Sequence, residues 1–165
     1  MLMKTLYLIR HAKSSWNFPD LADDQRPLLE KGKKRAKKVV DYLLDKDIKV
    51  DYIISSHAVR ALETAKIIAH ALHYPLNEIK VEHLIYHANP DKLFDQFYDI
   101  PEKCDSLMLV GHNPTFTSFA NCFLDDKIDW LPTSGVVSIS FDTDRWEDVV
   151  NVKCKTNFVV YPKNI

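Results

Sequence analysis

The sequence predicts an α/β fold of three layers (αβα), in which helices cover both faces of a mostly parallel central sheet with an antiparallel edge. The first observation is a set of short strand-like runs at residues 5–9, 51–56 and 106–111. The second is that helical patterns separate these runs, because a β-α-β-α order is typical of parallel strands covered on both faces. The third is the end of the chain, where "VVSISFDTD" and "VVNVKCKTNFVVYP" alternate with period two, as a hairpin or edge strands do.

The helices are predicted from apolar residues that recur at helical spacing over residues 28–46 and 57–74. A third helix is predicted to begin at Pro114 and to end near residue 124. The first of these patterns carries a cluster of basic residues that is flanked by acidic ones, in a chain that is close to neutral. We interpret the cluster as a solvated helix face, the alternative being a patch for an anionic partner. Its members are Lys31, Lys33, Lys34, Arg35, Lys37 and Lys38.

Length, composition, net charge and cysteine content limit the classes of protein to which the chain can belong. The length of 165 residues predicts one domain spanning residues 1–165, and 46% hydrophobic with 27% charged residues is typical of a soluble globular protein. A net charge of -1 favours neither nucleic acid nor a membrane as a partner, so any anion site must be local. The apolar runs are too short for a membrane span or a signal peptide. Three widely spaced cysteines argue against a disulfide framework, so we expect a cytoplasmic protein: Cys104, Cys122 and Cys154.

Arginine and histidine recur at three predicted strand-to-helix corners. Arg10 and His11 end the first apolar run. Arg60 lies in the first turn of the second helix, for which Ser55 or Ser56 is the expected N-cap. His112 follows the strand "SLMLV", with Asn113 expected at the N-cap and Pro114 at the first helical position.

Each of these corners has an ordinary explanation when it is taken alone, as a solvated arginine or as a simple helix start. The carboxyl ends of parallel strands, however, meet at one edge of a sheet, where ligands of α/β proteins bind. Two arginines and two histidines among helix N-termini are suited to binding phosphate. The sequence therefore predicts a convergent anion site.

The motifs "RHAKS", "SSHAVRALETA" and "GHNP", in this order, resemble those of the histidine phosphatase superfamily, which has the phosphoglycerate mutase-like fold. The segment "DQRPLLEKG" and the short chain are most similar to the SixA-like phosphohistidine phosphatases, and the resemblance covers roughly residues 5–142. It implies that His11 is the nucleophile that accepts the phosphoryl group. It also implies that Arg10, Arg26, Arg60 and His112 bind phosphate.

Further residues are expected at or near the phosphate because of their places in these motifs. Ser14, together with Lys13, follows the predicted nucleophile, and the loop at residues 133–134 either contributes to the site or is only a turn. His83 and His87 are four residues apart, a spacing that could hold a metal on a helix, but they lie in a predicted strand or loop with no adjacent carboxylate pattern, so we predict no metal and no cofactor. The expected substrate-binding residues besides Arg26 are Ser14, Asn17, His57 and Asn113.

Two positions depart from the family pattern. Ala12 stands where the first motif usually has glycine, which indicates a backbone that does not need a positive φ. Related mutases and broad phosphatases carry a proton-donating acid two residues after a leucine, whereas here Leu84 is followed by Ile85 and Tyr86. The residues that could substitute for this acid are Glu82, His87 and Asp91.

The predicted chemistry requires a neutral His11, and the neighbouring arginines should lower its pKa. Without an acid, a phosphohistidine is favoured over an alkyl phosphate, because its imidazole leaves without further protonation. We therefore predict a metal-independent phosphatase that acts on a phosphorylated protein, or on a small phosphorylated substrate, through phospho-His11. The alternatives are a catalytically idle phosphoprotein-binding module and, with less support, a mutase-type sugar-phosphate enzyme.

Overall fold

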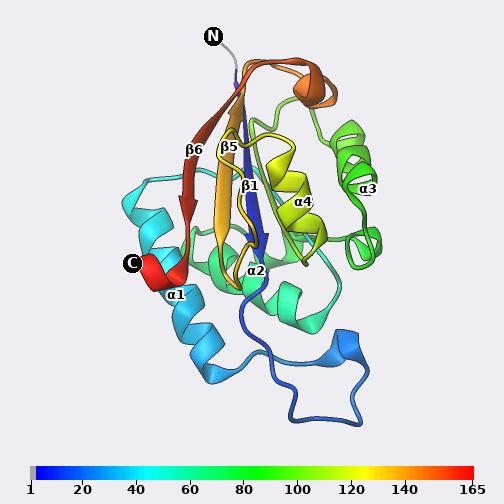
Figure 1. The fold of residues 1–165 in the computed structure, drawn as a ribbon, viewed down its shortest axis with the longest axis vertical. Helices are drawn as coiled ribbons and strands as arrows, with labels where there is room; N and C mark the ends of the chain where they lie inside the picture. Colours follow the sequence, from blue (N-terminus) through cyan, green and yellow to red (C-terminus); the bar gives the residue numbers. More distant parts are fainter. Residues whose placement is uncertain (1–2) are drawn as a thin grey trace.

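A computed structural model of the chain describes residues 3–165, which fold around one six-stranded sheet (Figure 1). The strand order is β3-β2-β4-β1-β5-β6. The pairs β3–β2, β2–β4 and β4–β1 are parallel, whereas β5 is antiparallel to both β1 and β6. This mixed sheet with an antiparallel edge confirms the predicted fold class. The strands are β1 (Lys4–Arg10), β2 (Tyr52–Ser55), β3 (Lys80–Val81), β4 (Ser106–Gly111), β5 (Val136–Phe141) and β6 (Cys154–Val160).

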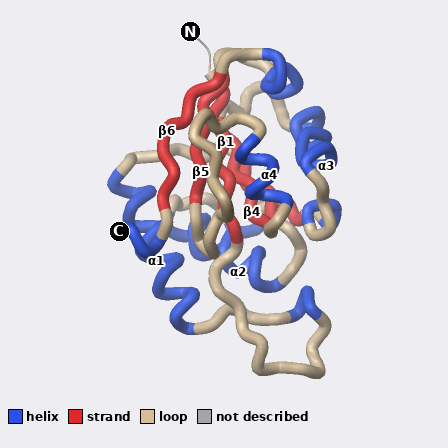
Figure 2. The backbone as a smooth tube through the Cα atoms, viewed as in Figure 1, coloured by secondary structure: helices blue, strands red, loops and turns tan. Residues whose placement is uncertain are grey.

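Four α-helices and several short 3-10 helices surround the sheet (Figure 2). The helices α1 (Glu30–Asp45) and α2 (Val59–Ala71) pack on one face, and α3 (Pro90–Asp95) and α4 (Thr115–Asn121) pack on the other. Of the helices that the structure describes, none combines the length and the apolar character needed to cross a membrane. The 3-10 helices span Asp23–Gln25, Leu76–Glu78, His83–Ile85, Gln96–Asp99, Trp146–Asn151 and Pro162–Asn164.

The alternation of side chains along β1 explains why the middle of this strand, residues 6–9, is apolar at every position. Leu6 and Leu8 point into the core under α3 and α4, whereas Tyr7 and Ile9 point into the core under α1 and α2. Successive side chains of a strand point to opposite faces, so a strand with helices on both sides needs an apolar residue at every position. The helices thus bury both faces of the strand whose end carries Arg10.

The predicted helix caps are wrong in detail. The N-cap of α2 is Ala58, and Ser56 instead accepts a hydrogen bond from the Ala58 N–H through its Oγ (3.2 Å). The helix α4 begins at Thr115, one residue later than predicted, although Asn113 Oδ1 still accepts from the N–H of Thr117 (3.1 Å). A turn between the strand and the helix places the first residue of both helices later in the chain than predicted. The Ser56 hydroxyl and the Asn113 amide oxygen nevertheless accept hydrogen bonds from backbone N–H groups near the helix starts.

The end of the chain forms the predicted antiparallel pair, β5 and β6, but the first residues of the second predicted run, 149–151, belong to the 3-10 helix Trp146–Asn151. Trp146 and Val149 are both buried in the core, three residues apart, which fits one turn of a 3-10 helix and not a strand. The indole N–H of Trp146 donates to the carbonyl of Cys104 (2.7 Å). Packing of these two side chains therefore overrides the alternating pattern.

Candidate active site

The candidate site lies at the carboxyl edge of the parallel strands. Arg10, the last residue of β1, is in register with Gly111, the last residue of β4. The N–H of His11 donates to the carbonyl of Gly111 (3.0 Å), which holds the two strand ends together. His11 and His112 therefore leave adjacent strands side by side, and their ring centroids lie 5.2 Å apart. The predicted convergence of these strand tips is confirmed.

A pocket of about 420 Å³ opens at these strand tips. The first turn of α2, the loop of residues 11–29, α1 through Arg35 and the loop before β5 contribute its other walls. Five of the residues that line it are arginine or lysine and none is aspartate or glutamate, so the pocket is suited to an anion. The lining residues are Arg10, His11, Lys13, Ser14, Trp16, Arg26, Arg35, Arg60, His112, Asn113 and Thr133.

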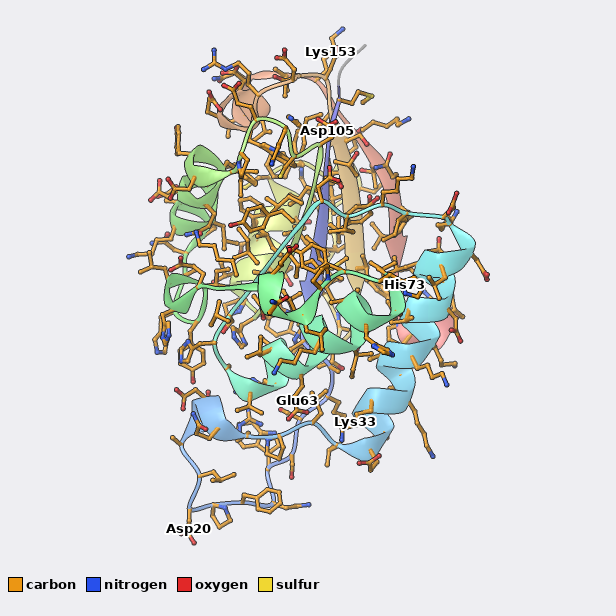
Figure 3. All side chains as sticks on the ribbon, turned by 180° about the vertical axis from the view of Figure 1, so that it is seen from behind. Asp20, Lys33, Glu63, His73, Asp105 and Lys153 are labelled. Atoms are coloured by element: carbon orange, nitrogen blue, oxygen red, sulfur yellow. The ribbon has the colours of Figure 1, made fainter. Side chains whose placement is uncertain are left out.

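Arg26 is buried and fixed by several partners on the loop of residues 11–29. Its guanidinium donates to Ser14 Oγ (2.9 Å) and to the carbonyl of Ser15 (3.2 Å), and the Trp16 ring covers it at 3.5 Å. The loop itself extends beyond the end of the sheet, with Asp20 at its tip (Figures 1 and 3). Hydrogen bonds within the protein occupy Nε and NH1 of the Arg26 guanidinium, and the described residues give NH2 no acceptor, so NH2 is the group that can donate to phosphate oxygens.

Asp23 connects Arg26 with Arg60, although no motif of the sequence indicated a role for it. Its Oδ1 accepts from Arg26 Nε (3.1 Å), its Oδ2 accepts from Arg60 NH2 (3.0 Å), and its carbonyl accepts from Arg60 NH1 (2.7 Å). The hydrogen bond from the Tyr86 hydroxyl, more than the two arginines, lowers the pKa of Asp23 to about 2. Asp23 is thus an anion that orients both guanidinium groups. The one feature of the sequence that could have indicated this role of Asp23 is its position three residues before Arg26.

The hydrogen bonding of His11 determines which ring nitrogen is free. Its Nδ1 lies 2.7 Å from the carbonyl of Ala12, and because a carbonyl only accepts, Nδ1 carries the proton. Nε2 then has the lone pair and forms no hydrogen bond with any residue between 3 and 165. Burial lowers the pKa of His11 to about 3, the Ala12 carbonyl opposes this shift, and Arg60, Arg10 and Arg26 add to it. The predicted direction is confirmed, but burial rather than the arginines is the largest cause.

The alanine in the first motif fits this backbone. Ala12 is fully buried and does not have a positive φ, as predicted. Its N–H donates to Thr64 Oγ1 on α2 (2.9 Å), and that hydroxyl donates to the carbonyl of Arg60 (2.7 Å). The residue after His11 is therefore fixed to the helix that carries Arg60.

His112 is buried beside His11 and bonded to the second strand tip. Its Nε2 lies 2.8 Å from Ser56 Oγ, while its buried Nδ1 has no hydrogen-bond partner in the described part of the chain. Burial, followed by the neighbouring His11 and Arg60, lowers the pKa of His112 to about 3. At neutral pH the free protein therefore holds two uncharged imidazoles among its arginines.

The structure brings some of the expected substrate-binding residues into the pocket and leaves others outside. Ser14 and Asn113 line it, and Asn113 Nδ2 donates to the carbonyl of Leu131 (2.6 Å). Asn17 is exposed on the outer loop and does not line the pocket, so its contact with a substrate stays a prediction. His57 is also outside, because its Nε2 lies 3.0 Å from Asp24 Oδ2 and its ring stacks on that of His83 at 4.0 Å.

The loop before β5 contributes Thr133 to the pocket, one of the two possibilities that the sequence left open. The adjacent Ser134 has a φ of 59°, in the left-handed region, and its N–H donates to the carbonyls of Arg10 (3.0 Å) and His11 (3.2 Å). This contact fixes the loop against the end of β1. Trp16 and Arg35 also line the pocket, although no motif indicated them.

None of the acids suggested by the sequence lines the pocket. Tyr86 donates its hydroxyl proton to Asp23, and partial burial followed by this bond raises its pKa. The carboxylate of Glu82 accepts from the N–H of Leu84 (3.2 Å), and neither His87 nor Asp91 lies in the pocket wall. Asp23 is ionised and Tyr86 holds its proton strongly, so neither is a good proton donor at neutral pH.

The two lowered histidine pKa values predict an unusual pH dependence. The nucleophile stays neutral down to about pH 3, so kcat/KM, corrected for substrate ionisation, should have no acid limb near pH 6.5. Between about pH 6.5 and 3 the unfolded chain binds more protons than the folded one, so the free energy of unfolding should fall with falling pH. Urea unfolding from pH 7 to 4 measures this slope, which His11→Ala should reduce and His70→Ala should not. An acid limb in kcat/KM near pH 6.5 would contradict the assignment of a buried neutral His11.

Comparisons with known proteins agree with this geometry. The family model of the histidine phosphatase superfamily (branch 1) matches residues 6–83, which include Arg10, His11, Arg26 and Arg60. An uncharacterised protein of Mycobacterium leprae is 29% identical over 152 residues, covering 84% of this chain and 90% of that protein. The match to the family model ends before His112, whose place therefore rests on the fold.

The fold is similar to solved structures over nearly the whole chain. A protein of Agrobacterium tumefaciens, provisionally named phosphohistidine phosphatase SixA, has a TM-score of 0.79 at 25% identity, over 96% of this chain and 98% of its own. The protein histidine phosphatase SixA in complex with tungstate has a TM-score of 0.78 at 17% identity, over 97% and 98% of the two chains. Residues 6–83 thus match the histidine phosphatase superfamily (branch 1), and the fold of the whole chain is similar to that of solved SixA structures.

Proposed function

We propose that the protein is a metal-independent phosphatase that hydrolyses phosphohistidine, or a related phosphomonoester, through a phospho-His11 intermediate. The observation that carries this proposal is the state of His11. Its Nδ1 proton is held by the Ala12 carbonyl, and the free Nε2 belongs to a neutral ring in a pocket lined by arginines. A neutral imidazole with a fixed tautomer is the form that attacks phosphorus.

The proposed reaction has two displacements. The Nε2 lone pair of His11 forms a bond to phosphorus while the bond from phosphorus to the leaving group breaks, and that group takes the electron pair. Arg10, Arg26 and Arg60 bind the phosphoryl oxygens and stabilise their charge in the transition state. Water then attacks the phosphorus of phospho-His11, which releases inorganic phosphate and restores the neutral ring.

The substrate class follows from which groups in the site can donate a proton to the leaving group. An alkoxide leaving group requires a proton, and a positioned acid typically contributes about 10²–10⁴-fold to the rate. Asp23 is ionised and the pKa of Tyr86 is raised, so neither supplies that proton. A phosphohistidine that is protonated on its other ring nitrogen leaves as neutral imidazole, whose conjugate acid has a pKa of about 6.5. This chemistry supports a phosphoramidate on a protein as the preferred substrate.

The solved relatives add support of a different kind. One of them is named a protein histidine phosphatase and was solved with tungstate, a tetrahedral oxyanion like phosphate. The arginine-lined pocket of this chain offers the same type of site. We therefore expect tungstate and vanadate to inhibit the proposed activity competitively.

The proposal is tested by turnover with p-nitrophenyl phosphate and with a phosphohistidine peptide, each with and without EDTA. Release of phosphate from both, unchanged by EDTA, is the expected result. Binding of the phosphopeptide without release of phosphate would instead identify an idle phosphoprotein-binding module. Activity that disappears with EDTA and returns with Zn²⁺ or Mg²⁺ would contradict metal independence.

A second prediction concerns the leaving group. The rate of the native protein should fall steeply as leaving-group pKa rises, with phosphoimidazole and p-nitrophenyl phosphate hydrolysed readily and alkyl phosphates hardly at all. Tyr86→Glu should raise alkyl phosphate hydrolysis by up to ~10²-fold, because it places a carboxyl beside the anionic Asp23, which favours its protonated form. Hydrolysis of phosphoimidazole should change little.

Tyr86→Phe is the matched control, because it removes the hydroxyl and keeps the ring that contacts His112 at 5.3 Å. It should give no gain in alkyl phosphate hydrolysis. A flat dependence of the native rate on leaving-group pKa, with the chemical step rate-limiting, would mean that the site holds a proton donor after all.

A further inference from the structure

A second groove adjoins the proposed active site. It has a volume of about 400 Å³ and shares Arg35 and Thr133 with the phosphate pocket, so the two spaces are continuous along this edge of the protein. Lys38 and Lys163 add two more positive charges to it. Its remaining wall is formed by rings of Pro132, Tyr161 and Pro162.

Helix geometry explains why only part of the basic cluster of α1 faces this groove. Arg35 and Lys38 are three residues apart and lie on one side of the helix, whereas Lys33 and Lys37 line a separate apolar groove between α1 and α2. All of these side chains are exposed, as the sequence predicts. The sequence cannot show that one stripe of the cluster continues from the phosphate pocket.

The charges of this groove are not neutralised by the protein. In the part of the chain that the structure describes, no carboxylate pairs with Arg35, Lys38 or Lys163. Neither the pocket nor the groove is lined by aspartate or glutamate, although the whole chain has a net charge of -1. Positive charge is therefore concentrated on this surface, where it attracts an anionic partner.

We infer that this groove binds acidic residues of a protein substrate that lie near its phosphorylated side chain in the chain or on the surface. The inference rests on the proposed phosphatase function and specifies what that substrate presents beside the phosphoryl group. The groove combines separate cations with the apolar rings of Pro132, Tyr161 and Pro162. Such a mixed surface suits a polypeptide, whereas a small phosphorylated molecule would occupy only the pocket around His11.

The test uses two phosphohistidine peptides that differ only in flanking residues, Asp and Glu in one and Asn and Gln in the other. In the native protein kcat/KM should be higher for the acidic peptide, mainly through KM, and this preference should shrink as salt rises. The double variant Lys38→Gln/Lys163→Gln should lower kcat/KM for the acidic peptide by roughly 2- to 30-fold, the range for two exposed ion pairs. Turnover of p-nitrophenyl phosphate should not change, because neither lysine lines the phosphate pocket.

The matched control is Lys34→Gln/Lys37→Gln, which removes two charges from exposed positions of α1 that do not line the groove. It should retain the preference for the acidic peptide. Equal kcat/KM for the two peptides, or equal losses in the two double variants, would overturn the inference. If p-nitrophenyl phosphate is still turned over in that case, the proposed function is not affected. Inhibition by an oligonucleotide that depends on Lys38 and Lys163, without a preference for the acidic peptide, would also overturn it. No turnover of any of these substrates would refute the proposed function, and the inference with it.

Discussion

Replacing His11 with alanine is expected to abolish turnover and to leave the fold intact. The proposed role of the ring is covalent, and the other imidazole of the pocket, that of His112, has its Nε2 bonded to Ser56 and its Nδ1 buried out of reach of a substrate. The measurement is single-turnover hydrolysis of a ³²P-labelled phosphohistidine peptide. The native protein should accumulate acid-labile label on the chain, and His11→Ala should not.

His70→Ala is a suitable control, because His70 lies on α2 away from the pocket and lines the apolar groove instead. It should retain native labelling and turnover. Circular dichroism and the thermal midpoint check that His11→Ala is folded. Acid-labile label on the His11→Ala protein at the native level would rule out His11 as the nucleophile.

Replacing Arg60 with alanine is expected to lower kcat/KM by about 10²–10³-fold, the cost of losing a preorganised donor to a transition-state oxyanion. Arg60 is buried, and Asp23 holds it through both terminal nitrogens. Arg60→Lys should recover only part of this loss. An ammonium group keeps the charge but cannot bond Asp23 and hold a planar fork on phosphate at the same time.

The loss in Arg60→Ala has two possible origins, since the side chain both anchors the loop that carries Asp23 and faces the pocket. Asp23→Ala separates them, because it removes the carboxylate and keeps the guanidinium. A smaller loss in Asp23→Ala than in Arg60→Ala is expected. Equal losses, or full activity in Arg60→Lys, would mean that Arg60 does not act on phosphate directly.

The sequence by itself determined the layered α/β fold and the meeting of its strand tips. β1 is apolar from Leu6 to Ile9 because helices cover both of its faces there, and polar residues begin again at Arg10 because the strand ends there. The places of Arg10, His11 and His112 follow from two facts that are local in sequence, the end of a strand and the parallel direction of its neighbour. Such features do not depend on the errors of one to three residues in the predicted caps of α4 and α2.

The tertiary structure alone decided how the pocket is completed by loops. Asp23 bonds Arg60 across 37 positions of the chain, and Tyr86 reaches Asp23 across 63. His57 and Asn17 lie close in sequence to site residues, yet His57 turns to Asp24 and Asn17 remains exposed. Loop conformation depends on contacts between distant residues, which no short pattern encodes.

For the electrostatics of the site, too, one part can be predicted from the sequence and another part depends on the fold. Neighbouring arginines could be foreseen from motifs, and they do lower the pKa of His11, but burial contributes more. The extent of burial depends on how α2, the loop of residues 11–29 and the loop before β5 pack around the ring, and desolvation acts only on a group that packing has removed from water. The sequence could therefore name the nucleophile candidate, whereas the neutral state of His11 required the folded chain.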